Sequence, residues 1–194
     1  MVLETSQPSR NFFKLVIPPL TAITLFVVTF FVLIIPSFEE AMLQDRKDMT
    51  RELTNVAWSI LSKLHDREKT GEISRAEAQA MAKTIIDSLR YGSENKDYFW
   101  LIDKNVRMIA HPYRPDLDGK DVSSFRDPNG KALFVDLVNI VNTQESGYSE
   151  YYWQWKDDPD HIVPKLSYVK GFTPWSWIIG TGIYIQDVKE QIHQ

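Results

Sequence analysis

The sequence predicts an α+β protein, in which an antiparallel sheet of five strands packs on a long N-terminal helix that one transmembrane helix precedes. Three observations lead to this class. Residues 15–38 carry no charge, residues 37–91 repeat apolar side chains every three or four positions, and residues 97–184 contain stretches of alternating apolar and polar side chains. These patterns are typical of a membrane span, of amphipathic helices and of two-faced strands.

The uncharged stretch near the N-terminus, LVIPPLTAITLFVVTFFVLIIPSF, is long enough to cross a bilayer, which takes about 20 apolar residues. We expect an uncleaved transmembrane helix over residues 15–36, with a cleaved signal peptide or a buried helix as the alternatives. Arg10 and Lys14 precede this helix, and basic flanks stay on the cytoplasmic side. Residues 1–14 are therefore predicted to be cytoplasmic, and residues 37–194 to lie outside the membrane.

Composition narrows the function classes. From residue 37 onward 20 basic residues face 25 acidic ones, and this net charge of −5 gives no support to nucleic-acid binding. The sequence has no cysteine, which excludes disulfides, thiolate zinc sites and covalent c-type haem. It also has no GxSxG, HExxH or glycine-rich phosphate loop. We predict a domain that is not an enzyme and carries no cofactor.

Two features could suggest a metal, and neither has the right spacing. In DLDGKD, residues 116–121, Gly119 follows Asp118 directly and no glutamate closes the loop, so the EF-hand pattern is missing. The four histidines, at positions 65, 111, 161 and 193, lie in segments of different kinds. We expect no metal site and interpret DLDGKD as a solvated turn.

Two helices are expected after the membrane segment. The first covers residues 37 to about 70 and ends at Gly71. Its apolar stripe consists of Met49, Leu53, Val56, Ile60 and Leu64, widened by Ala57 and Leu61. Ser74 and Glu77 have the spacing of a capping box, which predicts the start of a second helix. That helix is predicted to end near residues 90–92.

The sheet follows the helices. Its strands are expected at residues 97–103, 106–111, 147–155, 165–172 and 175–184, the first two as a hairpin and the last three as a meander. A long loop, 112–128, and a helix, 130–142, separate the two groups, and a last helix starts at residue 187. We expect the long helix on one face of the sheet and the segment 112–143 over part of the other. The space below that segment is a natural small-ligand pocket.

The stretch KLSYVKGFTPWSWIIGTGIY, residues 165–184, raises two specific expectations. Gly180 and Gly182 alternate onto one face of the last strand, which predicts that another group approaches the strand closely there. In a regular strand Lys165 and Tyr168 face opposite sides. Both can line one site only if Pro164 makes the entry to the strand irregular.

Aromatic and cationic side chains gather on the predicted sheet. Tyr98 and Trp100 share one strand face by alternation, and Tyr151 and Trp153 share another. Further candidates stand at the ends of elements, namely Arg90, Tyr91, His111 and Lys165. An arginine fork holds a carboxylate through two hydrogen bonds, a lysine adds a point charge, and tyrosine hydroxyls donate hydrogen bonds. These groups suit a small anionic ligand.

Each candidate also has an ordinary structural interpretation. Aromatic side chains on strands are more often part of the core than of a pocket. Arg90 could cap the C-terminus of its helix, where a cation complements the helix dipole. His111 could simply end a strand, and Lys165 could be a solvated strand edge that prevents aggregation. The residues alone leave these alternatives open.

The motifs of the outer domain occur in an order that resembles a known family. DYFWLIDKNVRMIAHPYRPDLDGKDVSSFRDPNGKALF is followed by GYSEYYWQW and then by PKLSYVKGFTPWSWIIGTGIYIQDV. Together with the membrane helix and the long helix, this pattern resembles the single Cache sensor domain of bacterial chemoreceptors and sensor histidine kinases. The resemblance covers about residues 37–194.

The resemblance implies a PAS-like sheet and the binding of small molecules, typically short carboxylates, in a pocket above it. Carried over by position, the expected ligand-binding residues are Arg90, Tyr91, Tyr98, Trp100, His111, Lys165 and Tyr168. The resemblance further implies a homodimer through the long helix and a location in the bacterial inner membrane, with the sensor domain in the periplasm. Ligand occupancy would then be relayed across the membrane in chemotaxis or two-component signalling.

Two rival functions stay open. A module that docks a periplasmic solute-binding protein would have an interior filled by side chains, whereas an anchored enzyme would bring an acid and a base together in one cleft. Members of the family normally continue into a second membrane helix and a cytoplasmic signalling module, and this sequence stops at Gln194. We expect either a fragment or a truncated relative with no output of its own.

Overall fold

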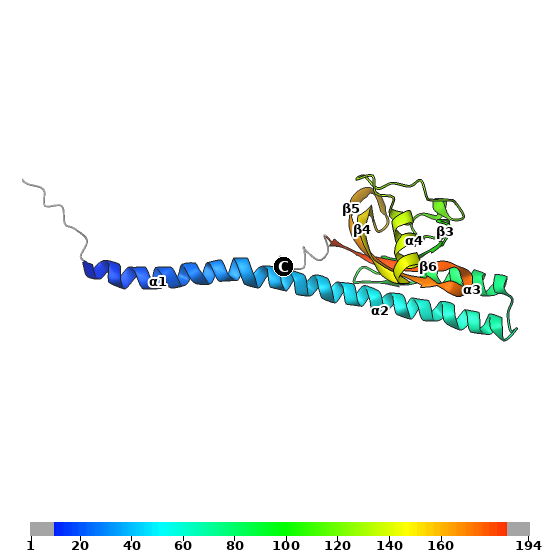
Figure 1. Cartoon of the computed structure of the whole chain (residues 1–194), viewed down its shortest axis with the longest axis horizontal. Helices are drawn as coiled ribbons and strands as arrows, with labels where there is room; N and C mark the ends of the chain where they lie inside the picture. The colour runs from blue at the N-terminus through cyan, green and yellow to red at the C-terminus, as the bar shows by residue number, and fades with distance from the viewer. Residues whose placement is uncertain (1–9, 186–194) are drawn as a thin grey trace, which may run out of the picture. The chain divides into compact units, whose positions relative to one another are not determined.

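The computed structural model describes residues 10–185 (Figure 1). The chain divides into two compact units, residues 1–43 and 44–194, and each is described by itself. The helix expected from residue 187 lies outside the described residues.

The N-terminal unit is helical. Helix α1, Arg10–Thr29, is followed by a π-helical turn, η1, Phe30–Ile34, and by the start of helix α2, Ile35–Lys69. The helix that begins at Phe13 is long and apolar enough to cross a membrane, and its hydrophobic side chains are exposed, Phe26 by 67%. A bilayer would cover such exposed apolar side chains, and the boundaries 15–36 of the span stay a prediction.

In the second unit, α2 buries a different stripe from the one expected. The buried side chains are Thr50, Thr54, Ala57, Leu61 and Leu64. The predicted stripe is therefore wrong in its N-terminal part, because Val56 is 63% exposed and Met49, Leu53 and Ile60 are only half-buried. Threonine can take the buried positions since its hydroxyl bonds to its own helix: Thr54 Oγ1 donates to the carbonyl of Thr50 over 2.8 Å.

Helix α3, Arg75–Ser88, begins at the predicted capping box. The backbone N–H of Glu77 donates to Ser74 Oγ over 3.2 Å, and the N–H of Ser74 donates to Glu77 Oε2 over 2.8 Å. The pair satisfies two N–H groups that the first helical turn leaves without partners. Its carboxylate is held in place by these bonds, which also lower the pKa of Glu77.

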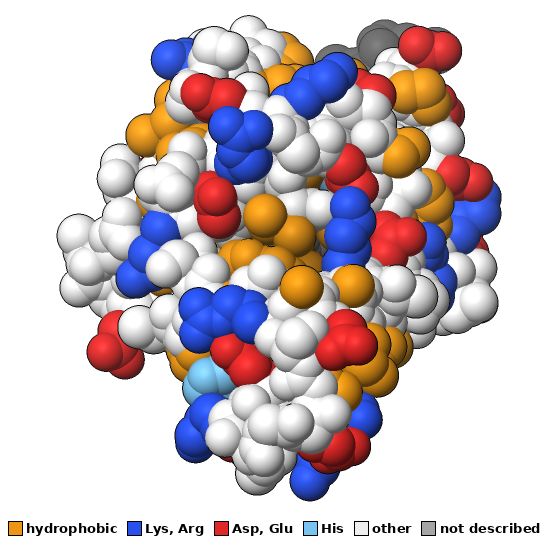
Figure 2. All heavy atoms as spheres, turned by 90° about the vertical axis from the view of Figure 1, so that its right-hand side faces the viewer, with side chains coloured by type: hydrophobic (Ala, Val, Ile, Leu, Met, Phe, Trp, Pro, Cys, Tyr) orange, Lys and Arg blue, Asp and Glu red, His pale blue; other side chains and the backbone are white. Residues whose placement is uncertain are grey.

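Ion pairs on the surface join neighbouring elements. Arg75 of α3 pairs with Glu68 of α2 over 2.7 Å, and Lys83 of α3 pairs with Asp118 of the long loop over 3.0 Å. Figure 2 shows one face of the molecule, on which basic and acidic side chains are interspersed around a hydrophobic patch. Exposed pairs of this kind contribute roughly 0–1 kcal/mol each, so the buried faces of the sheet decide the stability.

The sheet has six antiparallel strands. They are β1 (Arg90–Tyr91), β2 (Asp97–Asp103), β3 (Met108–Ala110), β4 (Ser146–Trp155), β5 (Asp158–Phe172) and β6 (Trp177–Tyr184). Their order is β1-β2-β6-β5-β4, and β3 pairs with β2. All five predicted strands are present, while β1 is an addition that the sequence analysis assigned to the end of a helix. Pro164 lies inside β5 and leaves the pairing from Ile162 to Lys170 in register.

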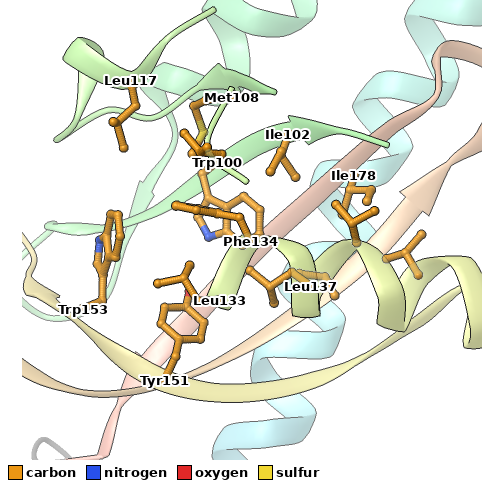
Figure 3. Close-up of a cluster of buried hydrophobic side chains, with 14 of the residues drawn as sticks. Trp100, Ile102, Met108, Leu117, Leu133, Phe134, Leu137, Tyr151, Trp153 and Ile178 are labelled. Atoms are coloured by element: carbon orange, nitrogen blue, oxygen red, sulfur yellow. The ribbon is translucent and has the colours of Figure 1, made fainter. Parts of the chain in front are cut away.

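Each face of the sheet has its own hydrophobic cluster. On one face Phe99 and Ile179 pack against α2 and α3. On the other, Trp100 and Ile178 pack against helix α4, Leu133–Gln144, and against the loop that contains the 3-10 turn η2, Pro115–Leu117. Figure 3 shows Phe134 and Leu137 of α4 directed at Trp100 and Ile178. The α4 side of the sheet is the face that the sequence analysis reserved for a ligand.

The two glycines of β6 are needed for close packing. A Cβ atom added at Gly180 would lie 2.3 Å from the ring of Trp100, and one added at Gly182 would lie 2.3 Å from Ser167 Oγ. The expected close approach is therefore confirmed, and the approaching groups belong to the neighbouring strands β2 and β5. Without Gly180, Trp100 could not pack this closely on β6.

Candidate functional site

The centre of the candidate site is a buried lysine. Lys165 is 1% exposed and lies in β5, opposite Tyr151 of β4 and Tyr184 of β6 in the strand register. Its ammonium group donates to the hydroxyl of Tyr98 over 2.9 Å and to that of Tyr184 over 3.5 Å. It also lies 4.0 Å from the ring centre of Tyr98. The sheet therefore carries a cation into its interior between aromatic rings.

No acidic side chain among residues 10–185 forms an ion pair with Lys165. Burial lowers the pKa of Lys165 to about 7, and the charge of Asp97 opposes this shift. A buried charge is costly unless it is paired. The lysine is thus held in a state that an incoming anion would stabilise.

Two buried nitrogen atoms close to this lysine have no hydrogen-bond partner among the described residues. They are Nδ1 of His111 and Nε1 of Trp153. The ring centres of His111 and Trp153 are 5.4 Å apart, and those of His111 and Tyr98 are 4.9 Å apart. Burial and the charges of Lys165 and Arg114 hold the pKa of His111 well below its usual range, so its ring is neutral. Unsatisfied buried polar atoms are rare in folded proteins and point to a missing partner.

Tyrosine hydroxyls complete the cluster. Burial raises the pKa values of Tyr98, Tyr151 and Tyr184, so each hydroxyl keeps its proton. Tyr151 and Ser167 share a hydrogen bond of 2.8 Å. Tyr184 donates to the carbonyl of Gln154 over 3.0 Å. We call Tyr98, His111, Tyr151, Trp153, Lys165 and Tyr184 the Lys165 cluster.

The cluster is rich in donors and poor in acceptors. An ammonium group, an indole N–H and neutral hydroxyls meet in a space from which water is excluded, and no carboxylate of the described residues bonds to them there. Charge-assisted hydrogen bonds in such surroundings are strong. Chemically, the arrangement can hold a small anion with two or more acceptor oxygens.

Among the described residues, no group of three or more His, Asp or Glu side chains could hold a metal ion. Asp118 of the DLDGKD segment instead accepts the backbone N–H of His111 over 3.0 Å. The carboxylate that might have suggested a metal ligand therefore holds the end of β3 against the loop.

Comparison with known proteins identifies the fold. The family model described as single Cache domain 2 matches residues 42–194. The chain belongs to this family. Among its relatives are the methyl-accepting chemotaxis protein McpP of Pseudomonas putida, 38% identical over 148 residues, and the sensor histidine kinase MctS of Rhizobium johnstonii, 32% identical over 157 residues. These matches cover 76% and 81% of this chain but 27% and 32% of the relatives, so the chain spans about a third or less of their length.

Solved structures agree with this Cache assignment. One is the periplasmic sensor domain of a chemotaxis protein, with a TM-score of 0.71, 39% identity, and coverage of 74% of this chain and 97% of that chain. Another, solved as the structural basis for carboxylic acid recognition by a Cache chemosensory domain, has a TM-score of 0.71, 36% identity, and coverage of 75% and 97%. The predicted family and the PAS-like α+β fold are confirmed.

The Cache fold brings four of the seven expected ligand residues to the α4 face of the sheet. Tyr98, His111 and Lys165 lie together in the Lys165 cluster. Trp100 lies on the same face and packs over Gly180. Arg90 reaches the cluster only through another side chain. Its guanidinium donates to the carbonyls of Asp87 and Leu89. The guanidinium also lies over the ring of Tyr113, and this ring contacts Tyr98. The helix-capping interpretation of Arg90 is therefore correct for its hydrogen bonds.

Tyr91 and Tyr168 are not brought to the cluster, and the structure corrects both expectations. The Tyr91 hydroxyl bonds to Thr181 Oγ1 over 2.7 Å, and its ring packs on Phe99 on the α2 and α3 face. Tyr168 packs against Tyr148, whose hydroxyl donates to the Lys47 carbonyl of α2. For Tyr168 the reason is strand periodicity, because Pro164 does not disturb the register that separates Tyr168 from Lys165.

Three members of the cluster, Tyr151, Trp153 and Tyr184, were not among the expected ligand-binding residues. Tyr151 and Trp153 were placed on one strand face without being included, and Tyr184 was not singled out. The signal that would have found Tyr151 and Tyr184 is the strand register, since Lys165 pairs with both. Trp153 then follows from Tyr151 by strand alternation.

Proposed function

We propose that this Cache domain binds a short carboxylate at the Lys165 cluster and relays its occupancy across the membrane in chemotaxis or two-component signalling. The observation that carries the proposal is a fully buried lysine whose hydrogen-bond partners, among the described residues, are two tyrosine hydroxyls. The carboxylic acid recognition named for the similar Cache structure supports the same ligand class.

The chemistry of the cluster favours a carboxylate over a neutral or cationic ligand. A carboxylate has two oxygens that accept several hydrogen bonds, which matches the ammonium of Lys165, the indole N–H of Trp153 and the tyrosine hydroxyls. A cationic ligand would be repelled by the charge of Lys165, with which no acidic side chain of the described residues forms an ion pair. The rings of Tyr98, His111 and Trp153 contact one another, with centres 4.9 and 5.4 Å apart, so a molecule of a few carbon atoms would require the smallest rearrangement of the site.

Strand β5 offers a physical link between ligand and output. It carries Lys165 at its middle, and near its C-terminal end the carbonyl of Gly171 accepts from Trp58 Nε1 of α2 over 2.9 Å. Lys170 Nζ donates to Asn55 of the same helix over 2.8 Å. A ligand that favours one of two placements of β5 would therefore shift the population of α2 placements as well.

The membrane arrangement and the dimer belong to this proposal. Residues 1–14 are assigned to the cytoplasm, 15–36 to the bilayer and 37–194 to the periplasmic side of a bacterial inner membrane. The homodimer would form through the side of α2 that carries Val56, which is 63% exposed, together with the half-buried Met49, Leu53 and Ile60 beside it. An apolar stripe at this spacing suits packing against a second helix.

Thermal unfolding of the 194-residue chain in detergent micelles tests the binding proposal. The panel contains acetate, propionate, lactate and pyruvate, with amino acids, amines and purines as other classes. A ligand at a hundredfold excess over its Kd stabilises the folded state by about 2.7 kcal/mol. We expect a rise in Tm with short carboxylates, its loss in Lys165→Met, and its retention in the control Lys120→Met, which changes an exposed lysine.

A Tm that no compound raises would contradict the proposal. That result would favour the rival function, docking of a periplasmic solute-binding protein, and a pull-down from periplasmic extract would then be the next experiment. A rise with amines or purines alone would keep a sensor but overturn the carboxylate assignment.

A further inference from the structure

A surface cleft of about 360 Å³ lies between the long loop and the β4–β5 hairpin. Its wall includes Arg114, Phe125, Arg126, Trp153, Gln154 and Ile162. The volume is within the range of small-molecule sites, yet this cleft is not the Lys165 cluster, since Lys165, Tyr98 and His111 are absent from its wall. The cleft and the Lys165 cluster have one residue in common.

That shared residue is Trp153. It lines the cleft, and its ring is 5.4 Å from that of His111, a member of the cluster. Figure 3 shows the indole projecting from β4 on the same side as Tyr151. The indole is therefore a partition, with the cleft on one side and the cluster on the other.

The cluster itself is closed. Lys165 and Tyr98 are each 1% exposed and His111 is 3% exposed, so a ligand reaches them only if some side chain moves. On the cleft side, Trp153 is covered by side chains of the loop, the ring of Phe125 at 5.4 Å and the guanidinium of Arg114 at 6.0 Å. Segments without regular secondary structure open at a lower free-energy cost than strands or helices.

The wall of the cleft carries two arginines and one carboxylate. The carboxylate, Asp127, is 6% exposed and accepts three backbone N–H groups, whereas Arg126 is exposed. Arg114 is paired with Asp116 through two bonds of 2.8 Å. Arg126 donates to the carbonyls of Ser123 and Phe125 and has no acidic partner among residues 10–185. An unpaired cation at the mouth of a cleft raises the local concentration of anions and the rate at which they enter.

We propose that this cleft is the entrance by which the anionic ligand reaches the Lys165 cluster, with Trp153 as the side chain that moves to admit it and Arg126 as the charge that attracts it. The proposal rests on the proposed function. It gives Arg126 a role in the rate of binding and gives Trp153 the same role in addition to the contact that its indole N–H would make with the ligand.

A variant that fills the cleft with a larger side chain tests whether the ligand enters through it. Ile162 lines the mouth and is 43% exposed, so Ile162→Trp fills the passage without touching the cluster. Because a blocked passage hinders entry and exit alike, both rate constants should fall by the same factor, at least about threefold, while Kd stays constant. The control Met81→Trp adds the same ring at a 38% exposed position of α3 and should change neither rate.

A charge variant tests the role of Arg126. In Arg126→Gln we expect the association rate constant to fall roughly two- to fivefold at low salt, with dissociation unchanged and the difference lost at high ionic strength. Arg107→Gln is the matched control, because this exposed arginine also donates to a loop carbonyl, that of Gly119, and does not line the cleft.

The rates are read from line shapes of ¹³C-labelled propionate exchanging with the full chain in nanodiscs. Unchanged rates in Ile162→Trp would overturn the route, while the proposed function would stand if wild-type binding and its loss in Lys165→Met are observed. A weaker Kd with faster dissociation would make the cleft part of the binding site and would also overturn its role as a passage. If the wild-type chain binds no carboxylate, both proposals fall together.

Discussion

The ammonium nitrogen of Lys165 lies 2.9 Å from the hydroxyl of Tyr98 and 4.0 Å from the centre of the same ring. The two residues are 67 positions apart in the sequence and come from strands that are not neighbours, since β6 lies between β2 and β5. A Cβ atom at Gly180 or Gly182 of β6 would meet Trp100 of β2 or Ser167 of β5, so both flanking strands pack closely over β6. The candidate site therefore lies in a region of close packing over β6.

Removing the Tyr98 hydroxyl should weaken ligand binding while keeping the fold. In Tyr98→Phe the ring stays, but the bound carboxylate loses a hydroxyl donor beside Lys165, and a hydrogen bond to a charged group is worth about 1.5–3 kcal/mol. We expect a ten- to hundredfold rise in Kd, roughly, by titration calorimetry. The matched control is Tyr91→Phe, which removes a hydroxyl bonded to Thr181 on the opposite face and should leave Kd unchanged.

The pKa of Lys165, lowered to about 7, predicts how stability depends on pH. In the unfolded chain the group titrates near its ordinary value of 10.5, so between pH 7 and 10.5 the unfolded state binds more protons than the folded state. The free energy of unfolding should therefore rise with pH over this window, by up to about 1.4 kcal/mol per unit. In Lys165→Met that rise should be absent from urea titrations at pH 7, 8 and 9.

Ligand affinity should change in the opposite direction. A carboxylate pairs with the protonated ammonium, so affinity should be highest below pH 7 and fall as Lys165 loses its proton. Binding near pH 8 should take up a proton, which appears as a dependence of the calorimetric enthalpy on the ionisation enthalpy of the buffer. Asp97 and His111 also face this charge, and a proton uptake that persists in Lys165→Met would assign the effect to them instead.

Individual residues show how much of the fold and of the candidate site could be predicted from the sequence. Alternation along the strands correctly predicted that Tyr98 and Trp100 share one face and that Tyr168 faces away from Lys165. Alternation could not say which face meets α2, because both faces are apolar and each packs against helices. The role of Tyr184 depends on the register of β5 against β6, which is set by long-range pairing.

Because long-range packing cannot be seen in a sequence pattern, the buried stripe of α2 was also predicted wrongly. Two adjacent apolar stripes fit the helical period, and the more hydrophobic one, through Met49 and Val56, was the natural choice. The sheet selects the other because Thr50 and Thr54 are smaller and bond their hydroxyls to their own helix. Close approach to a sheet is a requirement that hydrophobicity alone does not express.

Gly180→Ala should destabilise the domain through Trp100. The new Cβ would lie 2.3 Å from the indole ring, so the ring has to shift, and overpacking of this kind costs about 1–3 kcal/mol. Urea unfolding measures this loss. Trp100→Leu makes room for the methyl group, so the double variant should lose less stability than the sum of the two single variants. Strictly additive losses would show that Gly180 is not required by the packing of Trp100.

The exposed side of α2 around Val56 predicts a contact between two copies of the chain. The chain has no cysteine, so a single Val56→Cys variant provides one thiol, at a position that is 63% exposed. If α2 packs against its counterpart in a homodimer, mild oxidation in nanodiscs should cross-link this variant at low protein concentration. Ala80→Cys, on the exposed side of α3, is the control and should stay monomeric on a denaturing gel.

A charge at the same position tests whether the contact stabilises the dimer. Val56→Asp would bring two carboxylates into an apolar interface, where each loses hydration without gaining a partner. We expect the dimer fraction in sedimentation analysis to fall by an order of magnitude or more, because each buried charge costs several kcal/mol. An unchanged dimer fraction, together with absent cross-linking at Val56, would mean that the two copies meet elsewhere or not at all, and that this stripe faces solvent.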